Sequence, residues 1–532
     1  MRYEKLTAVI SAAALALSGC AGNTSAGNHL SGNNSAAAPT AASPEETQTA
    51  EMTDTESAAE KIATSLSKID PAKWNFNAED NVYWQVEIPY CENPAMLEYE
   101  TLGIFVPAAY MEAADNGDGT YTCQIKEDAA IGGYTAMTAP IVIPVNTPGY
   151  MAMTAPSDYV SSAADYTDAG FIYVNAGCRG RNEGAPAGVT DLKAAVRYIR
   201  YNEGNIPGSM ERIFTFGMSG GGAQSALMGA TGDSELYLPY LEAIGAVMGV
   251  SDAVAGSMCW CPVTNLDYAD EAYEWNMGMS RTGLDQEMQA LSDGMAEAFA
   301  FYINGLKLKD EEGNVLVLAP SETGIYQAGS YYDYMKTVIE TSLNHFLQDT
   351  EFPYTASSGK GMAGGFVNEN GQMQNDGINR EFVKPDQTEP TTYETVQDYI
   401  DSLNQNTQWV IYDSTSNTAS ITSVEDFIKN CKKASKNVGA FDDLERTQGE
   451  NMLFGCGDGA GAHFDPIMAE LLKGNETYEA AYAEDLTKLD FLGNAVNIRM
   501  NMYNPMYYLC SSYEGYQTSN VAKYWRIRTG IT

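Results

Sequence analysis

The order of apolar and polar positions predicts a sheet that begins antiparallel and continues parallel. Between residues 82 and 125 aliphatic and polar side chains alternate, and a turn rich in aspartate and glycine at 115–119 predicts a hairpin there. Short, mostly apolar runs at 141–145, 170–175 and 212–217 are typical of strands buried on both faces. Between the last two runs, one apolar stripe at helical spacing predicts a helix that begins near Asp191. This alternation of strands and helices implies a parallel sheet covered by helices.

The turn after the run at 212–217 carries the first candidate chemistry. Gly217, Ser219 and Gly221 have the spacing of a nucleophile elbow, in which a strained strand-to-helix turn lifts a serine hydroxyl above the sheet. Glycine is required on both sides because a Cβ atom would collide with the crossing strand or helix. The fold class predicted is therefore an α/β-hydrolase fold, a mostly parallel sheet with helices on both faces. The alternative is a glycine-rich turn without chemistry.

The pattern divides the remaining chain. From 269 to 430 it changes to helical stretches, a loop rich in glycine and asparagine at 357–379, and a strand expected at 409–412. We interpret 269–430 as an inserted lid that excludes water and contacts substrate, although a plain structural insertion is the alternative. The hydrolase core then comprises residues 61–268 and 431–532.

The first sixty residues predict export and a tether. Two cations precede a short apolar run at 6–17, and Leu17-Ser18-Gly19-Cys20 follows, which resembles the lipobox of bacterial lipoproteins. The resemblance implies cleavage before Cys20 and lipidation of its thiol, and an ordinary secretory signal is the alternative. Residues 21–60 lack aromatic side chains and indicate a disordered tether. We predict an extracytoplasmic lipoprotein of the bacterial cell membrane, attached only through its N-terminal lipid.

Charge and cysteine content narrow the partners. With 30 Lys and Arg against 70 Asp and Glu, the net charge of −40 disfavours nucleic acid and anionic membrane surfaces. Eight cysteines remain after Cys20, and the sequence leaves four disulfides or buried thiols equally open. A structural zinc site is disfavoured because the chain has only three histidines, and Cys259 and Cys261 have no second cysteine pair at the spacing of a zinc finger.

A serine nucleophile needs a base, and in α/β hydrolases the chain order is Ser, then Asp or Glu, then His. His29 precedes Ser219 and is excluded, and His345 lies beside the apolar stripe of a helix. His463 ends a glycine-rich loop at 455–462, which suits delivery of an imidazole, so it is the predicted base.

The acid must lie between the serine and the histidine. Asp442, Asp443 and Glu445 are candidates, and Asp442 is expected at the end of a short strand formed by 438–441. A solvated acidic turn is the alternative. The oxyanion hole would use the backbone N–H of Gly220 and one from the loop after residue 145, near Gly149 or Tyr150.

Several stretches together resemble the bacterial tannases, α/β hydrolases that cleave esters of gallic acid. They are residues 176–181, 191–200, 217–222, 261–267, 440–442, 463–464 and 524–530. The resemblance implies Ser219 as nucleophile, Asp442 as acid and His463 as base. It also implies an acid that binds galloyl hydroxyls, for which Asp443 or Glu445 are candidates, while the family's lid lysine and glutamate have no clear counterparts. Met218 and Ala462 stand where fungal tannases and feruloyl esterases carry paired cysteines.

The sequence therefore predicts a lipid-anchored serine esterase for phenolic acid esters, with gallate esters first. It needs a small-molecule ester and neither a metal nor an organic cofactor. A feruloyl esterase, a general carboxylesterase or a peptidase on the same fold is the enzymatic alternative. A surface binding lipoprotein without turnover is the other. The oligomeric state and the disulfide pairing are left open.

Overall fold

A computed structural model describes residues 64–356, 391–432 and 434–528. The predicted signal peptide, Cys20, the tether at 21–60, His29 and the loop at 357–379 lie outside the described residues. Within the described ranges, every helix is too short or too polar to span a bilayer.

One eight-stranded sheet forms the core of the fold. Its spatial order is β1 (Asn75–Asn77), β2 (Val82–Pro89), β3 (Thr101–Pro107), β9 (Ile172–Ala176), β8 (Ile141–Val145), β10 (Ile213–Met218), β11 (Gly256–Trp260) and β16 (Tyr524–Arg528). β1, β2, β3 and β9 pair antiparallel, whereas all pairs from β9 to β16 are parallel. The predicted antiparallel entry and parallel continuation are confirmed. β11 was not singled out from the sequence because its mixed Gly-Ser-Met-Cys-Trp composition gives no apolar run.

Small hairpins lie outside the large sheet. β4 (Met111–Asp115) pairs with β5 (Tyr121–Ile125), which confirms the hairpin predicted at 115–119. β6 (Ala130–Ile131) pairs with β7 (Tyr134–Thr135), and β12 (Tyr354–Thr355) with β13 (Thr392–Tyr393).

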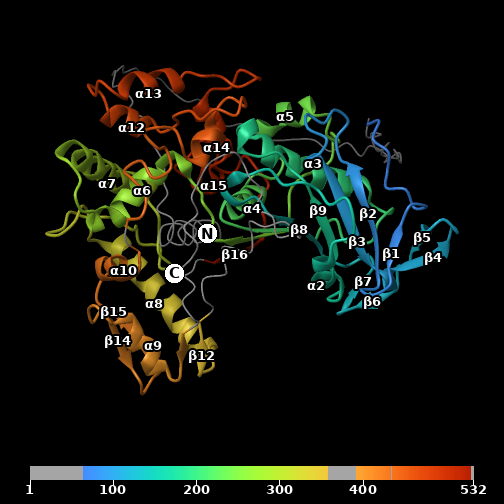
Figure 1. The fold of residues 1–532 in the computed structure, drawn as a ribbon, viewed down its shortest axis with the longest axis horizontal. Helices are drawn as coiled ribbons and strands as arrows, with labels where there is room; N and C mark the ends of the chain where they lie inside the picture. The colour runs from blue at the N-terminus through green and yellow to red at the C-terminus, as the bar shows by residue number, and fades with distance from the viewer. Residues whose placement is uncertain (1–63, 357–390, 433, 529–532) are drawn as a thin grey trace, which may run out of the picture.

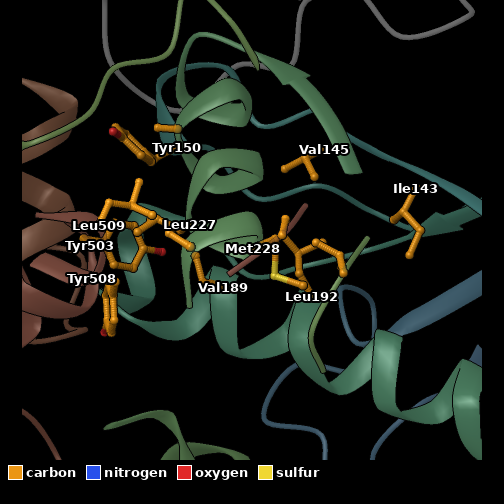
Figure 2. Packing of buried hydrophobic residues seen from close by; sticks show 14 of the residues in the cluster. Ile143, Val145, Tyr150, Val189, Leu192, Leu227, Met228, Tyr503, Tyr508 and Leu509 are labelled. Atoms are coloured by element: carbon orange, nitrogen blue, oxygen red, sulfur yellow. The ribbon is translucent and has the colours of Figure 1, made fainter. Parts of the chain in front are cut away.

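Helices cover the two faces of the sheet, as predicted, but unevenly. On one face α3 (Ala187–Tyr201) and α4 (Gly220–Ala230) pack against the strands (Figure 1). Ile143 and Val145 of β8 belong to the same buried cluster as Leu192 of α3 and Met228 of α4 (Figure 2). The other face carries the short α2 (Ala164–Thr167), whose Tyr166 stacks on Tyr173 with ring centroids 5.0 Å apart.

The described residues 269–356 and 391–432 form a helical body beside the sheet (Figure 1). It contains α6 (Ala269–Met277), α7 (Gln286–Leu306), α8 (Ser330–Asp349), α9 (Val396–Leu403) and α10 (Val424–Cys431), with the hairpin of β14 (Val410–Asp413) and β15 (Thr418–Ile421). β14 confirms the strand expected at 409–412. None of the strands described between 269 and 432 joins the large sheet. The lid boundaries and role stay predictions.

The last segment returns to the core before adding β16. The helices of this last segment are α11 (Gly449–Phe454), α12 (Pro466–Leu471), α13 (Glu479–Asp485), α14 (Val496–Met502) and α15 (Pro505–Leu509). The first part of the core also contains α5 (Leu238–Ala243). α15 packs on α4, and α11 packs on the turn formed by Pro148–Tyr150. The cysteines resolve one open question, because all eight in the described ranges are free thiols and five of them are buried.

Candidate active site

Ser219 occupies the predicted turn between β10 and α4. Its backbone has φ 57° and ψ −121°, a conformation that costs energy for a residue with a side chain. Hydrogen bonds hold it in place, because the Ser219 N–H donates to the Trp260 carbonyl at 2.9 Å and the Ser219 carbonyl accepts from the Ala223 N–H. The strand, strained turn and helix expected of a nucleophile elbow are all present.

Glycine is required around this turn by close backbone contacts. A Cβ atom on Gly221 would lie 2.0 Å from the Val145 carbonyl oxygen, and one on Gly217 would lie 2.4 Å from the Gly221 carbonyl oxygen. Both contacts are far inside van der Waals separation and both involve backbone that cannot rotate away. The start of α4 therefore presses directly on β8 and β10, and this contact fixes where Ser219 sits.

The turn Pro148–Tyr150 lies against the first residue of α4. A Cβ atom on Gly220 would be 2.5 Å from the Tyr150 nitrogen and 3.1 Å from the Gly149 nitrogen, so the two backbones are in direct contact. Gly220 opens the helix, and its N–H has no intrahelical acceptor. Of the two alternatives left by the sequence, the Tyr150 N–H already donates to the Thr147 carbonyl at 3.0 Å. The geometry thus favours Gly149 over Tyr150, and the oxyanion role of both glycines stays a prediction.

Arg181 holds this turn from the outside. Its Nη1 donates to the Gly149 carbonyl at 2.9 Å, and the side chain is almost fully buried. A charged donor on a carbonyl makes a stronger hydrogen bond than a neutral one, so it fixes the orientation of the peptide after Gly149. The stretch 176–181 stands out in the sequence, but nothing there predicts this role for Arg181.

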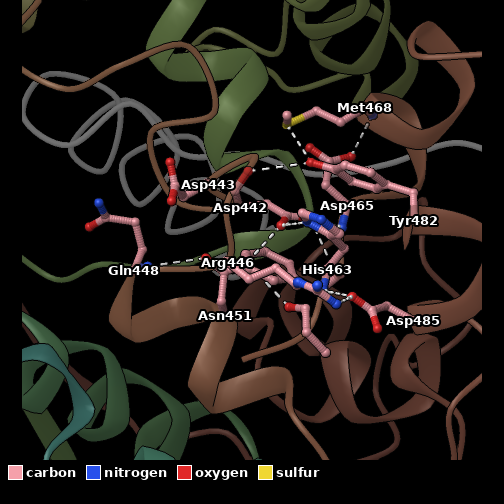
Figure 3. Close-up of polar contacts among 12 residues, drawn as sticks. Asp442, Asp443, Arg446, Gln448, Asn451, His463, Asp465, Met468, Tyr482 and Asp485 are labelled. Carbon is pink, nitrogen blue, oxygen red and sulfur yellow. Dashed lines mark hydrogen bonds and ion pairs between the residues drawn. The ribbon is translucent and has the colours of Figure 1, made fainter. Parts of the chain in front are cut away.

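Asp442 and His463 form a buried pair (Figure 3). His463 Nδ1 and Asp442 Oδ1 are 2.7 Å apart, and both residues are at most 1% exposed. The carboxylate also accepts from Asn451 Nδ2 at 2.7 Å and from two backbone N–H groups, those of Phe464 at 2.8 Å and Asp465 at 2.7 Å. Four donors fill the acceptor capacity of a carboxylate. The structure thus brings the predicted acid and base together across 21 residues of chain.

The expectation that Asp442 ends a strand is wrong. Residues 438–443 form no strand, and the loop is held instead by the first turn of α6. Asp270 Oδ1 accepts from the Phe441 N–H and Oδ2 from the Asp442 N–H, each at 2.9 Å. A carboxylate thus replaces the hydrogen bonds of a sheet. No periodic signal marks Asp270 in the sequence, because a buried acid in a helix looks like a surface acid.

Two residues that sequence reasoning missed hold His463 in place, one through its ring and one through its backbone. Tyr482 of α13 stacks face to face on His463, with centroids 3.7 Å apart and planes at 10°. Asp485 Oδ2 accepts from the His463 N–H at 2.9 Å. The other ring nitrogen, Nε2, is buried and has no hydrogen-bond partner among the described residues, so the Ser219 hydroxyl is not bonded to it.

Helix α11 connects the two halves of the site. Gly449 at its start is in contact with the turn at Gly149, while Asn451 two residues later binds Asp442. Catalytic hydrogen bonds are often long before substrate binds, so an unbonded Nε2 is compatible with a serine partner. The triad assignment itself stays a prediction.

The remaining candidates already have protein partners. Asp443 Oδ2 accepts from the Thr447 hydroxyl at 2.6 Å and from its N–H at 3.1 Å, which stabilises a turn. Glu445 is exposed and accepts from the Tyr478 hydroxyl at 3.2 Å. Their substrate-binding roles stay predictions. His345 is exposed on α8.

Comparison with known proteins shows which family and which solved structures this chain is similar to. The BD-FAE family, an α/β-hydrolase family, matches residues 132–276. A tannin acyl hydrolase from Lactobacillus plantarum is 28% identical over 84% of this chain and 83% of its own, with a TM-score of 0.60. A Fusobacterium nucleatum tannase is 26% identical over 89% and 88%, also with a TM-score of 0.60.

A tannin acyl hydrolase solved with 3,4-dihydroxybenzoate is 26% identical over 87% of each chain, with a TM-score of 0.62. None of the curated proteins matches the chain by sequence. The predicted α/β-hydrolase fold and the predicted resemblance to the bacterial tannases are confirmed.

Proposed function

We propose that this chain, an α/β hydrolase with the fold of the bacterial tannases, is a serine esterase that hydrolyses phenolic acid esters, gallate esters first. One observation carries the chemistry: a buried Asp442–His463 pair has an Nε2 without a partner among the described residues, and α11 links it to the strained turn of Ser219. Likeness to tannin acyl hydrolases over more than four fifths of the chain supports the ester class.

In this proposal each group has one task. The Ser219 hydroxyl attacks the ester carbonyl while His463 Nε2 takes its proton, and Asp442 holds Nδ1–H so that the base faces the serine. The Gly149 and Gly220 N–H groups stabilise the negative oxygen of the tetrahedral intermediate. His463 then returns the proton to the leaving alcohol, and water releases the acid from Ser219 by the same route.

The phenolic acid class rests on the structural neighbours. Two of the similar structures are tannin acyl hydrolases bound to ethyl gallate and to 3,4-dihydroxybenzoate, at 27% and 26% identity. A ring with adjacent hydroxyls needs polar acceptors at the far end of the acyl site. Asp443 and Glu445 are the proposed candidates. Thr447 engages Oδ2 of Asp443 and Tyr478 engages Oε1 of Glu445, so the other oxygen of either carboxylate would accept from a ring hydroxyl.

Hydrolysis and specificity are tested separately. A chromogenic acetate ester compared between wild type and Ser219→Ala measures turnover, and equal rates would leave a binding protein. Methyl gallate, methyl ferulate and a short aliphatic ester are then compared by kcat/KM. Preference for gallate by about tenfold or more, about 1.4 kcal/mol in transition-state binding, is expected. Equal values would leave a general esterase, and preference for ferulate would leave a feruloyl esterase.

Attachment to the membrane is a further part of the proposal and rests on the lipobox-like sequence before Cys20. In a bacterial host the full chain should fractionate with membranes and incorporate labelled fatty acid. Cys20→Ser should do neither and should keep its esterase activity in the soluble fraction. Label retained in Cys20→Ser would contradict the assignment.

A further inference from the structure

Three more buried carboxyl groups stand behind the Asp442–His463 pair. Asp270 and Glu271 project from the first turn of α6, and Asp465 is the N-cap of α12. All three are 0% exposed. Buried carboxylates are costly unless donors satisfy their oxygens, so counting the donors shows where charge can reside.

The count separates Glu271 from the others. Asp442 accepts four hydrogen bonds, and each oxygen of Asp270 accepts one from a backbone N–H. Asp465 Oδ1 accepts from the Ile467 and Met468 N–H groups at 2.7 and 3.0 Å. The oxygens without a donor among the described residues are Asp465 Oδ2 and both oxygens of Glu271.

The oxygens that lack donors belong to two groups in contact with each other. The side chains of Glu271 and Asp465 are within hydrogen-bonding reach. Two ionised carboxylates cannot hydrogen-bond, whereas a protonated one donates to the other. One proton therefore satisfies Asp465 Oδ2 and gives Glu271 a partner at the same time.

The surroundings favour that proton. Burial is the main reason that the pKa of Glu271 is raised well above its usual range, and the negative charges of Asp465 and Asp270 add to the effect. Burial, then the charge of Asp442, raises the pKa of Asp465 to about 7. The titratable groups that face the pair are Asp270 of α6, Asp442 of the acid loop, Asp267 before α6 and Tyr482 of α13.

We infer that Glu271 keeps its proton at neutral pH, donates it to Asp465 Oδ2, and so acts as a positioning residue for the triad acid. The inference rests on the proposed esterase function for its kinetic consequence. With its side chain fixed on both oxygens, Asp465 aims its own N–H and that of Phe464 at Asp442 Oδ2. Loss of the proton at high pH places two negative carboxylates in contact, separates α6 from α12 and loosens Asp442.

Two variants of similar size separate proton donation from simple packing. Glu271→Gln is always neutral and can still donate through Nε2, whereas Glu271→Leu is neutral and cannot. The kcat/KM of each is measured against pH on the best ester of the wild type. We expect Glu271→Gln to keep most of the neutral activity and to lose the alkaline decline shown by the wild type. Glu271→Leu should lose about tenfold in kcat with little change in KM, because a displaced acid slows chemistry more than binding.

An alkaline decline in Glu271→Gln that matches that of the wild type, or equal kcat in both variants, would overturn the inference.

A second measurement does not depend on turnover and is made in the Ser219→Ala background. An acid whose pKa is raised on folding takes up a proton, so its stabilisation is lost as pH rises above the unfolded value toward the folded one. The unfolding free energy from denaturant titration should fall between about pH 5 and 8. With Glu271 present, the slope of this fall against pH should correspond to about one more proton released on unfolding than in the Glu271→Gln chain.

Equal slopes would reject the shared proton even if the chain is an active esterase. A one-proton difference with no ester hydrolysis in the wild type would instead keep the shared proton and reject the proposed function.

Discussion

The two halves of the site are built in different ways. Around Ser219 the contacts are between backbone atoms, with the start of α4 pressed on β8 and β10 so closely that glycine alone fits. Around His463 the contacts are side-chain hydrogen bonds and one ring stack, contributed by α6, α11 and α13. The nucleophile is thus held by chain geometry, and the acid and base by a polar network.

This difference teaches where each half is vulnerable. Adding a single methyl group to tight backbone packing should lower the stability of the fold. Removing a donor from a polar network should lower the catalytic rate while the fold persists. Four substitutions, taken from the largest expected effect to the smallest, test that division.

Asp442→Asn should have the largest effect. An amide at this position can present a donor to His463 Nδ1 and favours the wrong tautomer, so kcat should fall about 10⁴-fold, roughly 5 kcal/mol, with the fold intact. Steady-state kinetics and circular dichroism check the two statements. Asp458→Asn, an exposed acid in the loop before His463, is the matched control and should change little. A loss below about tenfold in Asp442→Asn would remove it from the triad.

Gly221→Ala should act on folding. Its Cβ would lie 2.0 Å from the Val145 carbonyl oxygen, so the unfolding free energy should drop by about 3 kcal/mol as α4 moves off the sheet. Denaturant titration measures the drop. Gly305→Ala in α7, where a Cβ meets no atom within 4 Å, should gain up to about 1 kcal/mol instead. Similar values for both variants would contradict the close packing.

Asn451→Ala should act on chemistry. It removes the donor to Asp442 Oδ1 at 2.7 Å and to the Ala462 carbonyl at 3.2 Å, so the acid is left with an unfilled acceptor. We expect a loss in kcat of about 30-fold, roughly 2 kcal/mol, with KM nearly unchanged. Steady-state kinetics on the best ester of the wild type measures both constants. A rise in KM alone would place Asn451 in substrate binding.

Tyr482→Leu should have the smallest effect. The tyrosine ring lies flat on His463, which fixes the imidazole plane and favours its positive charge during proton transfer. We expect about fivefold lower kcat, roughly 1 kcal/mol, in the same kinetic assay. Tyr482→Phe keeps the ring and should retain at least about half of the wild-type kcat. If Phe and Leu behave alike, the hydroxyl contact of Tyr482 with the Asp442 carbonyl matters more than the stack.

The sequence predicted the nucleophile half well because its determinants are local. The apolar run, the turn and the glycines at 217–222 follow one another directly along the chain, and each has a steric reason that can be recognised without knowing the fold. The strand ending at Asp442 was predicted wrongly for the opposite reason. Asp270 lies 172 residues before Asp442 along the chain, and its carboxylate supplies the hydrogen bonds that a strand would have made.

By itself the sequence determined the parallel core and the turn that carries Ser219, because strand periodicity and glycine sterics act between near neighbours. It also selected His463 from three histidines, because the order of the catalytic residues along the chain leaves few choices. Only the tertiary structure decided which groups surround Asp442, that Gly149 lies beside Gly220, and that Glu271 meets Asp465. Those contacts depend on where separate helices come to rest. Burial then converts ordinary acids, amides and tyrosines into donors and acceptors whose roles follow from their neighbours.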